Sequence, residues 1–236
     1  MVKPRMVTHL SYVKNVELTG LFKLDNTQMD CQNYASDAAR DIRNLIKCRR
    51  TLIDNMIIII PKPLKGVLFI TKDNPGFISG QIRVRGKSGG QYPYKLLHAM
   101  DYVFGFEPNT IEVCSGKVTG MIDGTTTVDI NPKNNPAILD DAEILSRVPS
   151  EVYNRWRSDP PYNHNTAANM YNTGLPSPIR LLKAGARVCK PGSLLFLLLG
   201  PVNHQHHPEE LKRIGCIMLT VVPNNELRCL NIYYKL

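Results

Sequence analysis

The sequence predicts an α/β fold in which a mostly parallel sheet ends in an antiparallel hairpin. From residue 94 onward, strand-like runs alternate with helical stretches, which is typical of parallel strands joined by crossovers. The run "SLLFLLLG" (193–200) is almost wholly apolar, as expected for a strand that is buried on both faces. The last two strand-like runs, "RIGCIMLTVVP" and "ELRCLNIYYK", flank "NN", which is typical of a hairpin.

Composition narrows the class of protein. The chain has 236 residues, enough for one domain or slightly more. It carries 29 Lys and Arg against 20 Asp and Glu, and the net charge of +9 favours a polyanionic partner such as nucleic acid. The six cysteines include no C-x-x-C pair, which argues against zinc-ribbon and thioredoxin folds. No signal peptide opens the chain, so we expect a cytoplasmic protein with reduced thiols.

Residues 1–85 form the first of two expected regions, a small basic α+β part that would bind substrate or cover a cofactor. The stretch 36–50 predicts a helix, because a serine precedes an apolar stripe and basic residues crowd its end. Apolar runs at 56–60 and 66–71 predict two strands on either side of a proline-containing turn.

A basic strand is expected at "GQIRVRGKSGGQ" (80–91), where it ends in a glycine-rich loop. Its Arg83, Arg85 and Lys87 are candidates for contact with nucleic-acid phosphates. A solvated strand followed by a hairpin turn is the alternative, since it uses the same residue types.

Residues 86–236 form the second region, which carries most of the predicted sheet. A helix is expected at 94–106, before Glu107 and Pro108. The later runs predict strands at "NTIEVCSG" (109–116), "TTTVDINP" (125–132) and "SEVYNRWRS" (150–158), a short strand or loop with a helical turn at "NPAILDDAEILSRV" (135–148), and a helix at "SPIRLLKAGARVCKPG" (177–192).

Acidic or small residues stand at the ends of four successive expected strands. In chain order they are Ser115 and Gly116, then Asp129, then Asp140 and Asp141, and finally Asp159. A single acid at a strand end often caps the next helix. In open α/β sheets, however, ligands bind beyond the carboxyl ends of the strands, so four such ends in order predict a ligand site.

The fourth strand end carries the tetrapeptide Asp159-Pro160-Pro161-Tyr162, and "LLKAGARVCKPGSLLFLLLG" (181–200) follows it. With this combination, the chain from about residue 94 to 236 resembles the class I S-adenosylmethionine-dependent methyltransferases. It is most similar to the amino-methyltransferases with a D-P-P-Y motif, many of which methylate adenine N6 in DNA. The resemblance implies a Rossmann-like sheet, S-adenosylmethionine as the cofactor, DNA as the favoured partner, and no metal.

The same resemblance implies where the cofactor binds. The segment "EVCSG" (112–116) matches the family's first motif, in which the backbone of the turn approaches the cofactor. Asp129 matches the acid that holds the ribose hydroxyls, and Asp141 matches the acid that accepts from the adenine amino group; Asp140 could exchange roles with Asp141. The expected cofactor residues are Glu112, Cys114, Ser115, Gly116, Asp129, Ile130, Asp141 and Ala142.

The D-P-P-Y segment (159–162) suits an acceptor that is a flat amine. An aromatic amine is a weak nucleophile, because its lone pair is delocalised into the ring. The Asp159 carboxylate and the Pro160 carbonyl can accept from the two amine N–H groups, and Pro161 helps to hold that carbonyl rigid. Tyr162 offers a face for a flipped-out base, and Asn163 beside it is a further candidate contact.

Departures from the family pattern keep other interpretations open. Cys114 and Val118 stand where the family has glycines, and only residues 114–125 separate the first two strands, so a crossover helix would be very short or missing. The alternatives are an RNA methyltransferase, transfer to a cytosine or guanine amino group, and a non-catalytic nucleic-acid-binding module on a degenerate methyltransferase fold.

Three histidines and two aromatic residues have simpler explanations than catalysis. His204, His206 and His207 lie in "NHQHHPEE" and could bind a metal, but a polar loop or a substrate contact explains them as well. Tyr153 and Trp156 precede the D-P-P-Y segment and are expected to pack in the core.

Overall fold

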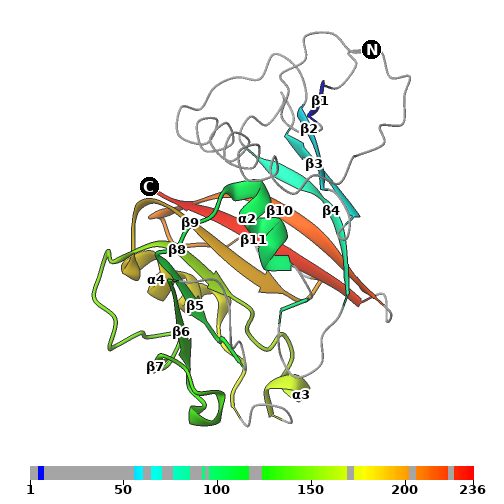
Figure 1. Cartoon of the computed structure of the whole chain (residues 1–236). Helices are drawn as coiled ribbons and strands as arrows, with labels where there is room; N and C mark the ends of the chain where they lie inside the picture. The colour runs from blue at the N-terminus through cyan, green and yellow to red at the C-terminus, as the bar shows by residue number, and fades with distance from the viewer. Residues whose placement is uncertain are drawn as a thin grey trace.

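The computed structural model describes residues 5–7, 56–60, 65–70, 77–85, 92–93, 96–116, 124–168, 173–201, 206–222 and 226–236. Within these residues the strands form one 11-stranded sheet, in the order β1-β2-β3-β4-β10-β11-β9-β8-β5-β6-β7 (Figure 1). The expected helix at 36–50 and the candidate contact Lys87 lie outside the described residues.

Four strands come from the first expected region. They are β1 (Arg5–Val7), β2 (Met56–Ile60), β3 (Lys65–Ile70) and β4 (Ile78–Arg85). The strands predicted from the two apolar runs are therefore confirmed as β2 and β3, which pair antiparallel. β4 pairs antiparallel with β3 on one side and parallel with β10 on the other, so one sheet continues from the first expected region into the second.

The centre of the second region is parallel. It consists of β5 (Thr110–Val113), β6 (Thr125–Asp129), β7 (Ile138–Leu139), β8 (Tyr153–Ser158) and β9 (Cys189–Leu199). From β5 the chain adds β6 and β7 on one side and then returns to add β8 and β9 on the other, with all four pairings parallel. The order thus reverses between β5 and β8, and such a switch point opens a crevice at the carboxyl ends of the strands.

The two last strands complete the sheet. β10 (Leu211–Val222) and β11 (Glu226–Lys235) pair antiparallel, and β11 lies between β10 and β9. This arrangement confirms the predicted fold class, a Rossmann-like sheet that is parallel at its centre and closes with a C-terminal antiparallel hairpin.

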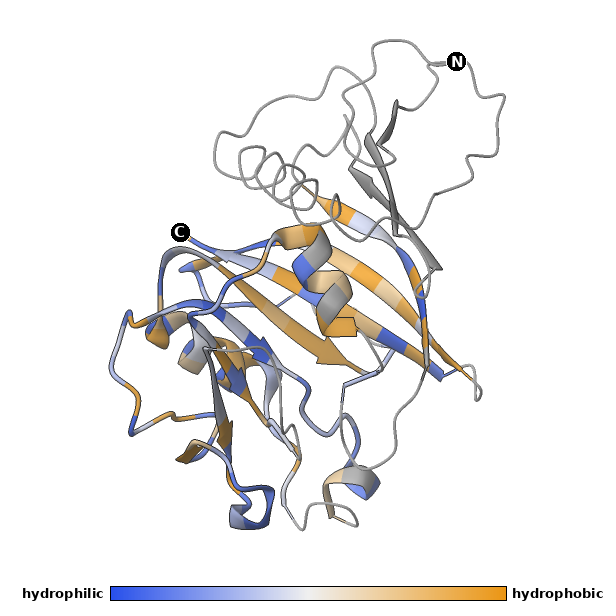
Figure 2. Ribbon diagram, viewed as in Figure 1, coloured by the Kyte–Doolittle hydropathy of each residue, from blue (hydrophilic) through white to orange (hydrophobic). Residues whose placement is uncertain are grey.

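Two helices cover opposite faces of the sheet. α2 (Leu96–Phe104) and α4 (Pro178–Val188) lie within the two stretches predicted to be helical. Side chains alternate along β9, so Leu194, Phe196 and Leu198 join the core beneath α2, whereas Leu195, Leu197 and Leu199 join the core beneath α4. Figure 2 shows the resulting apolar residues along β9 and α2. β9 begins at Cys189, directly after α4, so the "KPG" turn expected there belongs to the strand.

Short elements join the strands near the site. A 3-10 helix, η1 (Pro132–Asn134), follows β6, and α3 (His164–Thr166) follows the D-P-P-Y segment. In the part of the chain that the structure describes, no helix has the length and apolar character needed to span a membrane.

Helix α4 approaches the sheet closely at one point. A Cβ placed on Gly185 would lie 2.9 and 3.0 Å from two atoms of the Trp156 indole, closer than ordinary contacts. Trp156 is fully buried and Tyr153 is nearly so, which confirms that both are packing residues.

Candidate functional site

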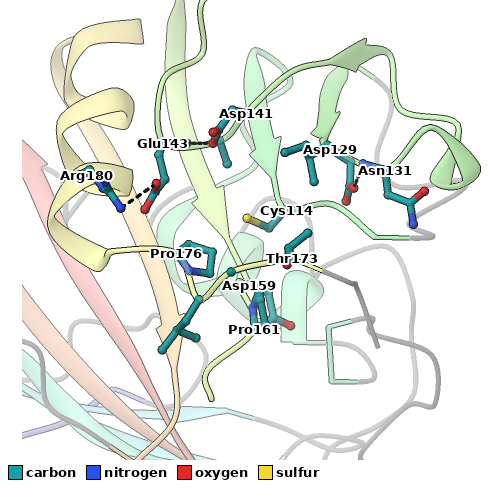
Figure 3. A pocket seen from close by; sticks show the side chains of 14 residues that line it. Cys114, Asp129, Asn131, Asp141, Glu143, Asp159, Pro161, Thr173, Pro176 and Arg180 are labelled. Carbon is teal, nitrogen blue, oxygen red and sulfur yellow. Dashed lines mark hydrogen bonds and ion pairs between the residues drawn. The ribbon is translucent and has the colours of Figure 1, made fainter. Parts of the chain in front are cut away.

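A cavity of about 240 Å³ opens at the carboxyl ends of β5, β6 and β8, where the strand order reverses (Figure 3). The predicted site residues that line it are Cys114, Asp129, Ile130, Asp141, Ala142, Asp159 and Pro161. Residues assigned by sequence to a cofactor and residues assigned to an acceptor amine therefore share one cavity.

The turn after β5 is bent as a glycine-rich turn would be. Cys114 has φ +53° and Gly116 has φ +55°, both in the left-handed region. That region is unfavourable for a residue with a Cβ, so Cys114 adopts a conformation that glycine normally supplies. Burial raises the pKa of the Cys114 thiol, which favours the neutral form over a reactive thiolate.

The Asp129 carboxylate holds this turn in place. Its Oδ2 accepts a hydrogen bond from the Gly116 N–H over 2.8 Å, and its Oδ1 accepts one from the Asn131 N–H over 2.8 Å. Each carboxylate oxygen has a second acceptor position, so Asp129 can also accept from the hydroxyl groups of a ligand. Beside it, the Ile130 side chain lines the cavity and is 55% exposed, an apolar surface suited to a flat ring.

Two adjacent acids after β7 (Ile138–Leu139) have different environments. Asp140 accepts from the Asp141 N–H, the Ser146 hydroxyl and the Arg147 N–H, so it organises its own loop. Asp141 lines the cavity, and its Oδ1 accepts from the Glu143 N–H over 2.8 Å. Of the two acids, Asp141 is the one placed to accept from a ligand.

One wall of the cavity, the loop 173–176 before α4, was not predicted from the sequence. Glu143 attaches this loop: its carboxylate accepts from the Ser177 N–H and pairs with Arg180 at 3.2 Å. Thr173, Gly174, Leu175 and Pro176 all line the cavity, as do Glu143 and Arg180. The sequence carries no signal for this wall, because it depends on a contact between segments that are distant along the chain.

Within the D-P-P-Y segment, Asp159 and Pro161 line the cavity, whereas Pro160 and Tyr162 do not. The Pro160 side chain is buried. A Cβ placed on Gly200 would lie 3.6 Å from Tyr162, so the tyrosine packs close to the end of β9. Burial, together with the nearby Glu226 carboxylate, raises the pKa of Tyr162 to about 12, so its hydroxyl remains protonated at neutral pH.

Asp159 has a partner that sequence analysis also missed. Its Oδ1 pairs with Nη2 of Arg228 on β11, and its Oδ2 lies 3.5 Å from Nη1 of the same guanidinium. The Arg228 side chain is only 8% exposed. Arg228 stands between Leu227 and Cys229 in the predicted strand "ELRCLNIYYK", and this was the available signal, because buried arginines are usually paired with a carboxylate.

Glu112 lies away from the cavity. It points to the α2 side of the sheet, is fully buried, and pairs with Nε of Arg157 on β8 at 2.9 Å. Burial raises the pKa of Glu112 to about 7, while Arg157 opposes the increase. On the same side, Arg155 of β8 pairs with Asp101 of α2 at 2.9 Å. Ser115 is buried, and neither it nor Gly116 is among the residues that line the cavity.

The structure describes the side chains of two of the four candidate nucleic-acid contacts. Arg83 is exposed on β4, and Asn163 is exposed next to the D-P-P-Y segment. The Arg85 side chain and all of Lys87 and His204 lie outside what the structure describes. Within the described ranges, no three His, Cys, Asp or Glu residues gather in a way that would hold a metal ion.

Comparison with known proteins gives only distant likenesses. No family model and no curated protein match this chain. Among solved structures, TrmN from Thermus thermophilus is 13% identical with a TM-score of 0.43, over 61% of this chain and 49% of TrmN. This chain therefore spans about half the length of TrmN.

Two further structures align over about half of this chain. The 16S rRNA (adenine(1408)-N(1))-methyltransferase from Catenulisporales acidiphilia is 10% identical with a TM-score of 0.35, over 54% of this chain and 87% of that one. The antibiotic-resistance methyltransferase Kmr is 13% identical with a TM-score of 0.34, over 54% and 86% of the two chains. At TM-scores below 0.5 these likenesses do not bear on function, which has to be inferred from the site itself.

Proposed function

We propose that this chain transfers a methyl group from S-adenosylmethionine to the exocyclic N6 amine of adenine in nucleic acid, with DNA as the favoured substrate. The observation that carries the proposal is the shared cavity at the switch point. Asp129 ends β6 and Asp141 follows β7, on one side of the point where the strand order reverses. Asp159 and Pro161 follow β8, on the other side, and all four residues line the cavity. Residues suited to a nucleoside cofactor thus lie beside residues suited to an acceptor amine.

The cavity has groups that suit the cofactor. Asp129 would accept from the ribose hydroxyls, Asp141 would accept from the adenine amino group, and Ile130 would contact the adenine ring. When bound, S-adenosylmethionine supplies a methyl group on a positively charged sulfur. Carboxylates that line the cavity favour a cation there.

The D-P-P-Y segment would position the acceptor. Asp159 and the Pro160 carbonyl would accept from the two N–H groups of the amine, which draws the nitrogen towards a tetrahedral geometry and frees its lone pair. Burial raises the pKa of the Asp159 carboxyl, while Arg228 opposes that shift. A carboxylate with a raised pKa holds a proton more readily, so Asp159 is also a candidate to receive the proton that the amine loses.

Residues 1–85 would contribute to substrate binding in this proposal. β4 is part of the same sheet as the site, and its Arg83 is exposed. Cationic side chains of this kind would contact phosphates and position the nucleic acid without selecting its sequence. Transfer to RNA, or to the amino group of cytosine or guanine, uses the same residues and remains the close alternative.

A second candidate function is a non-catalytic nucleic-acid-binding module. The ion pair between Asp159 and Arg228 favours it, because the carboxylate that would accept from an amine already has a partner. Calorimetry separates the two functions: the proposed enzyme binds S-adenosylmethionine, whereas absence of measurable binding would favour the module.

The proposal is tested by methyl transfer from cofactor with a labelled methyl group. Duplex DNA, single-stranded DNA and RNA are offered in parallel, and the products are digested to nucleosides to find the labelled one. We expect N6-methyladenosine or its deoxy form, with the label strongest in DNA. Label in RNA alone would mean that RNA, and not DNA, is the substrate. No label in any nucleic acid would refute the proposed activity.

A further inference from the structure

Arg228 occupies a specific place in the D-P-P-Y segment (159–162). Its guanidinium engages both oxygens of Asp159, and its central carbon lies 4.5 Å from the centre of the Tyr162 ring. The side chains of Arg228 and Asp159 are only 8% and 10% exposed. The cation is therefore held between the carboxylate and the aromatic ring, largely out of contact with water.

A guanidinium in this position has the main features of a bound nucleobase amine. It is planar, it presents two N–H donors to one carboxylate, and it lies over an aromatic ring. An exocyclic amine on a purine or pyrimidine would also donate its N–H groups to the Asp159 carboxylate, and the flat ring that carries the amine would stack on Tyr162. Arg228 and such a base would compete for the same groups.

We infer that Arg228 fills the amine subsite in the absence of substrate and is displaced by the base amine, which makes Arg228 and its neighbour Glu226 determinants of base selection. The inference rests on the proposed function for the assignment of a nucleobase to this subsite. It extends the proposed function to β11, a strand to which the resemblance to known enzymes assigns no role.

The competition between Arg228 and the base amine follows from the negative charge of Asp159. A buried carboxylate without a partner is strongly unfavourable, so Asp159 needs a donor at all times. Arg228 supplies that donor in the free protein. An exocyclic amine can replace it with two N–H donors, whereas thymine and uracil offer a single ring N–H between two carbonyl oxygens that repel the carboxylate. The exchange therefore selects adenine, cytosine and guanine against thymine and uracil.

Glu226 gives the displaced guanidinium a second partner. It lies two residues before Arg228 on β11, and residues two apart in a strand share a face. Glu226 is near both groups: after burial it is the next cause of the raised pKa of Tyr162, and together with Asp159 it raises the pKa of Arg228 against the effect of burial. Movement of the guanidinium from Asp159 towards Glu226 keeps it paired and uncovers the carboxylate and the ring.

The test compares binding of oligo(dA) with binding of oligo(dT) of equal length, followed by fluorescence anisotropy of a terminal dye. S-adenosylhomocysteine is present at saturation, so that adenine does not enter the cavity between Asp129 and Asp141. The quantity compared is the ratio of the two dissociation constants. Loss of a cation weakens phosphate contacts to both strands alike and cancels in this ratio.

Arg228→Met keeps the apolar stem of the side chain and removes the competing guanidinium. We expect this variant to increase the preference for oligo(dA) over oligo(dT) by about threefold or more, because the subsite no longer has to be vacated. Glu226→Gln should decrease the preference, because the displaced guanidinium loses its partner. The gain of Arg228→Met should disappear when Tyr162→Ala is added.

Matched variants exclude simpler explanations. Lys212→Met removes an exposed cation from β10 and should leave the ratio unchanged. Arg228→Lys keeps the charge but cannot form the planar fork, so it should increase the ratio by a smaller factor; it also serves if Arg228→Met fails to fold. An unchanged or lower ratio in the folded Arg228 variants would overturn the inference.

The result is separable from the proposed function. If the ratio changes as expected but no methyl transfer is found, the amine subsite stands and the chemistry is wrong. If methyl transfer is found and the Arg228 variants leave the ratio unchanged, the enzyme stands and Arg228 has no part in base selection.

Discussion

The Gly116 N–H donates to Oδ2 of Asp129 over 2.8 Å and thereby joins the turn after β5 to the end of β6. This bond joins two neighbouring parallel strands, and Cys114 after β5 and Asp129 at the end of β6 both line the cavity. One carboxylate therefore shapes the turn and faces the ligand space. A change at Asp129 should therefore affect both the shape of this turn and the binding of a ligand.

The first prediction concerns that coupling. Asp129→Ala should weaken S-adenosylmethionine binding by about ten- to a hundredfold, because it removes charged acceptors and leaves the Gly116 and Asn131 N–H groups unpaired. Calorimetric titration with the cofactor measures the change. Asp129→Asn keeps one side-chain acceptor and should have an intermediate affinity. Equal affinities for all three proteins would separate Asp129 from the cofactor.

The second prediction distinguishes the two adjacent acids. Asp141→Asn should weaken cofactor binding with little effect on the melting temperature, because Asp141 faces the cavity. Asp140→Asn should lower the melting temperature with little effect on binding, because Asp140 accepts three hydrogen bonds within its loop. Binding and melting curves for both variants test this. A reversed pattern would mean that Asp140 holds the ligand.

The third prediction concerns the pH dependence of the free energy of unfolding. Burial raises the pKa of Glu112 from 4.5 to about 7, so the folded state favours the protonated carboxyl. This stabilisation is complete below about pH 4.5 and is lost as pH rises through 7, at a scale of about 3 kcal/mol. Denaturant unfolding at several pH values should therefore show a steeper decrease in unfolding free energy for the wild type than for Glu112→Gln. Parallel pH profiles would contradict the raised pKa.

The fourth prediction concerns the contact between α4 and the sheet. Gly185→Ala places a Cβ against the buried Trp156 indole and should lower the unfolding free energy by about 1–2 kcal/mol, despite the better helix propensity of alanine. Lys183→Ala, at an exposed position of the same helix, is the control and should change the stability little. A Gly185→Ala variant more stable than the wild type would show that the indole moves aside.

Most of the sheet could be predicted from the sequence because each strand carries its own local pattern. The apolar β9, the paired β10 and β11, the acid at the end of β6 and the acid directly after β8 can all be recognised from local sequence. Parallel strands place their carboxyl ends at one edge, so Asp129, Asp141 and Asp159 could be expected near one another, as they are.

Other parts of the site depend on contacts that the sequence does not display. Glu112 occupies the acidic place of a motif, but strand alternation directs it to the opposite face, where Arg157 pairs with it. Cys114 replaces a glycine, yet it adopts a left-handed backbone conformation. The wall at 173–176 and the partner of Asp159 are set by tertiary packing, since Glu143 and Arg228 are far along the chain from the groups that they bind.

Asp159→Ala separates acceptor binding from cofactor binding, with labelled methyl transfer and calorimetric cofactor binding measured on the same preparation. We expect transfer to the best nucleic-acid substrate to fall by at least about a hundredfold while the dissociation constant for S-adenosylmethionine stays nearly unchanged. Full activity in the variant, or loss of cofactor binding in parallel with loss of transfer from a folded protein, would contradict the assignment of Asp159 to the acceptor amine.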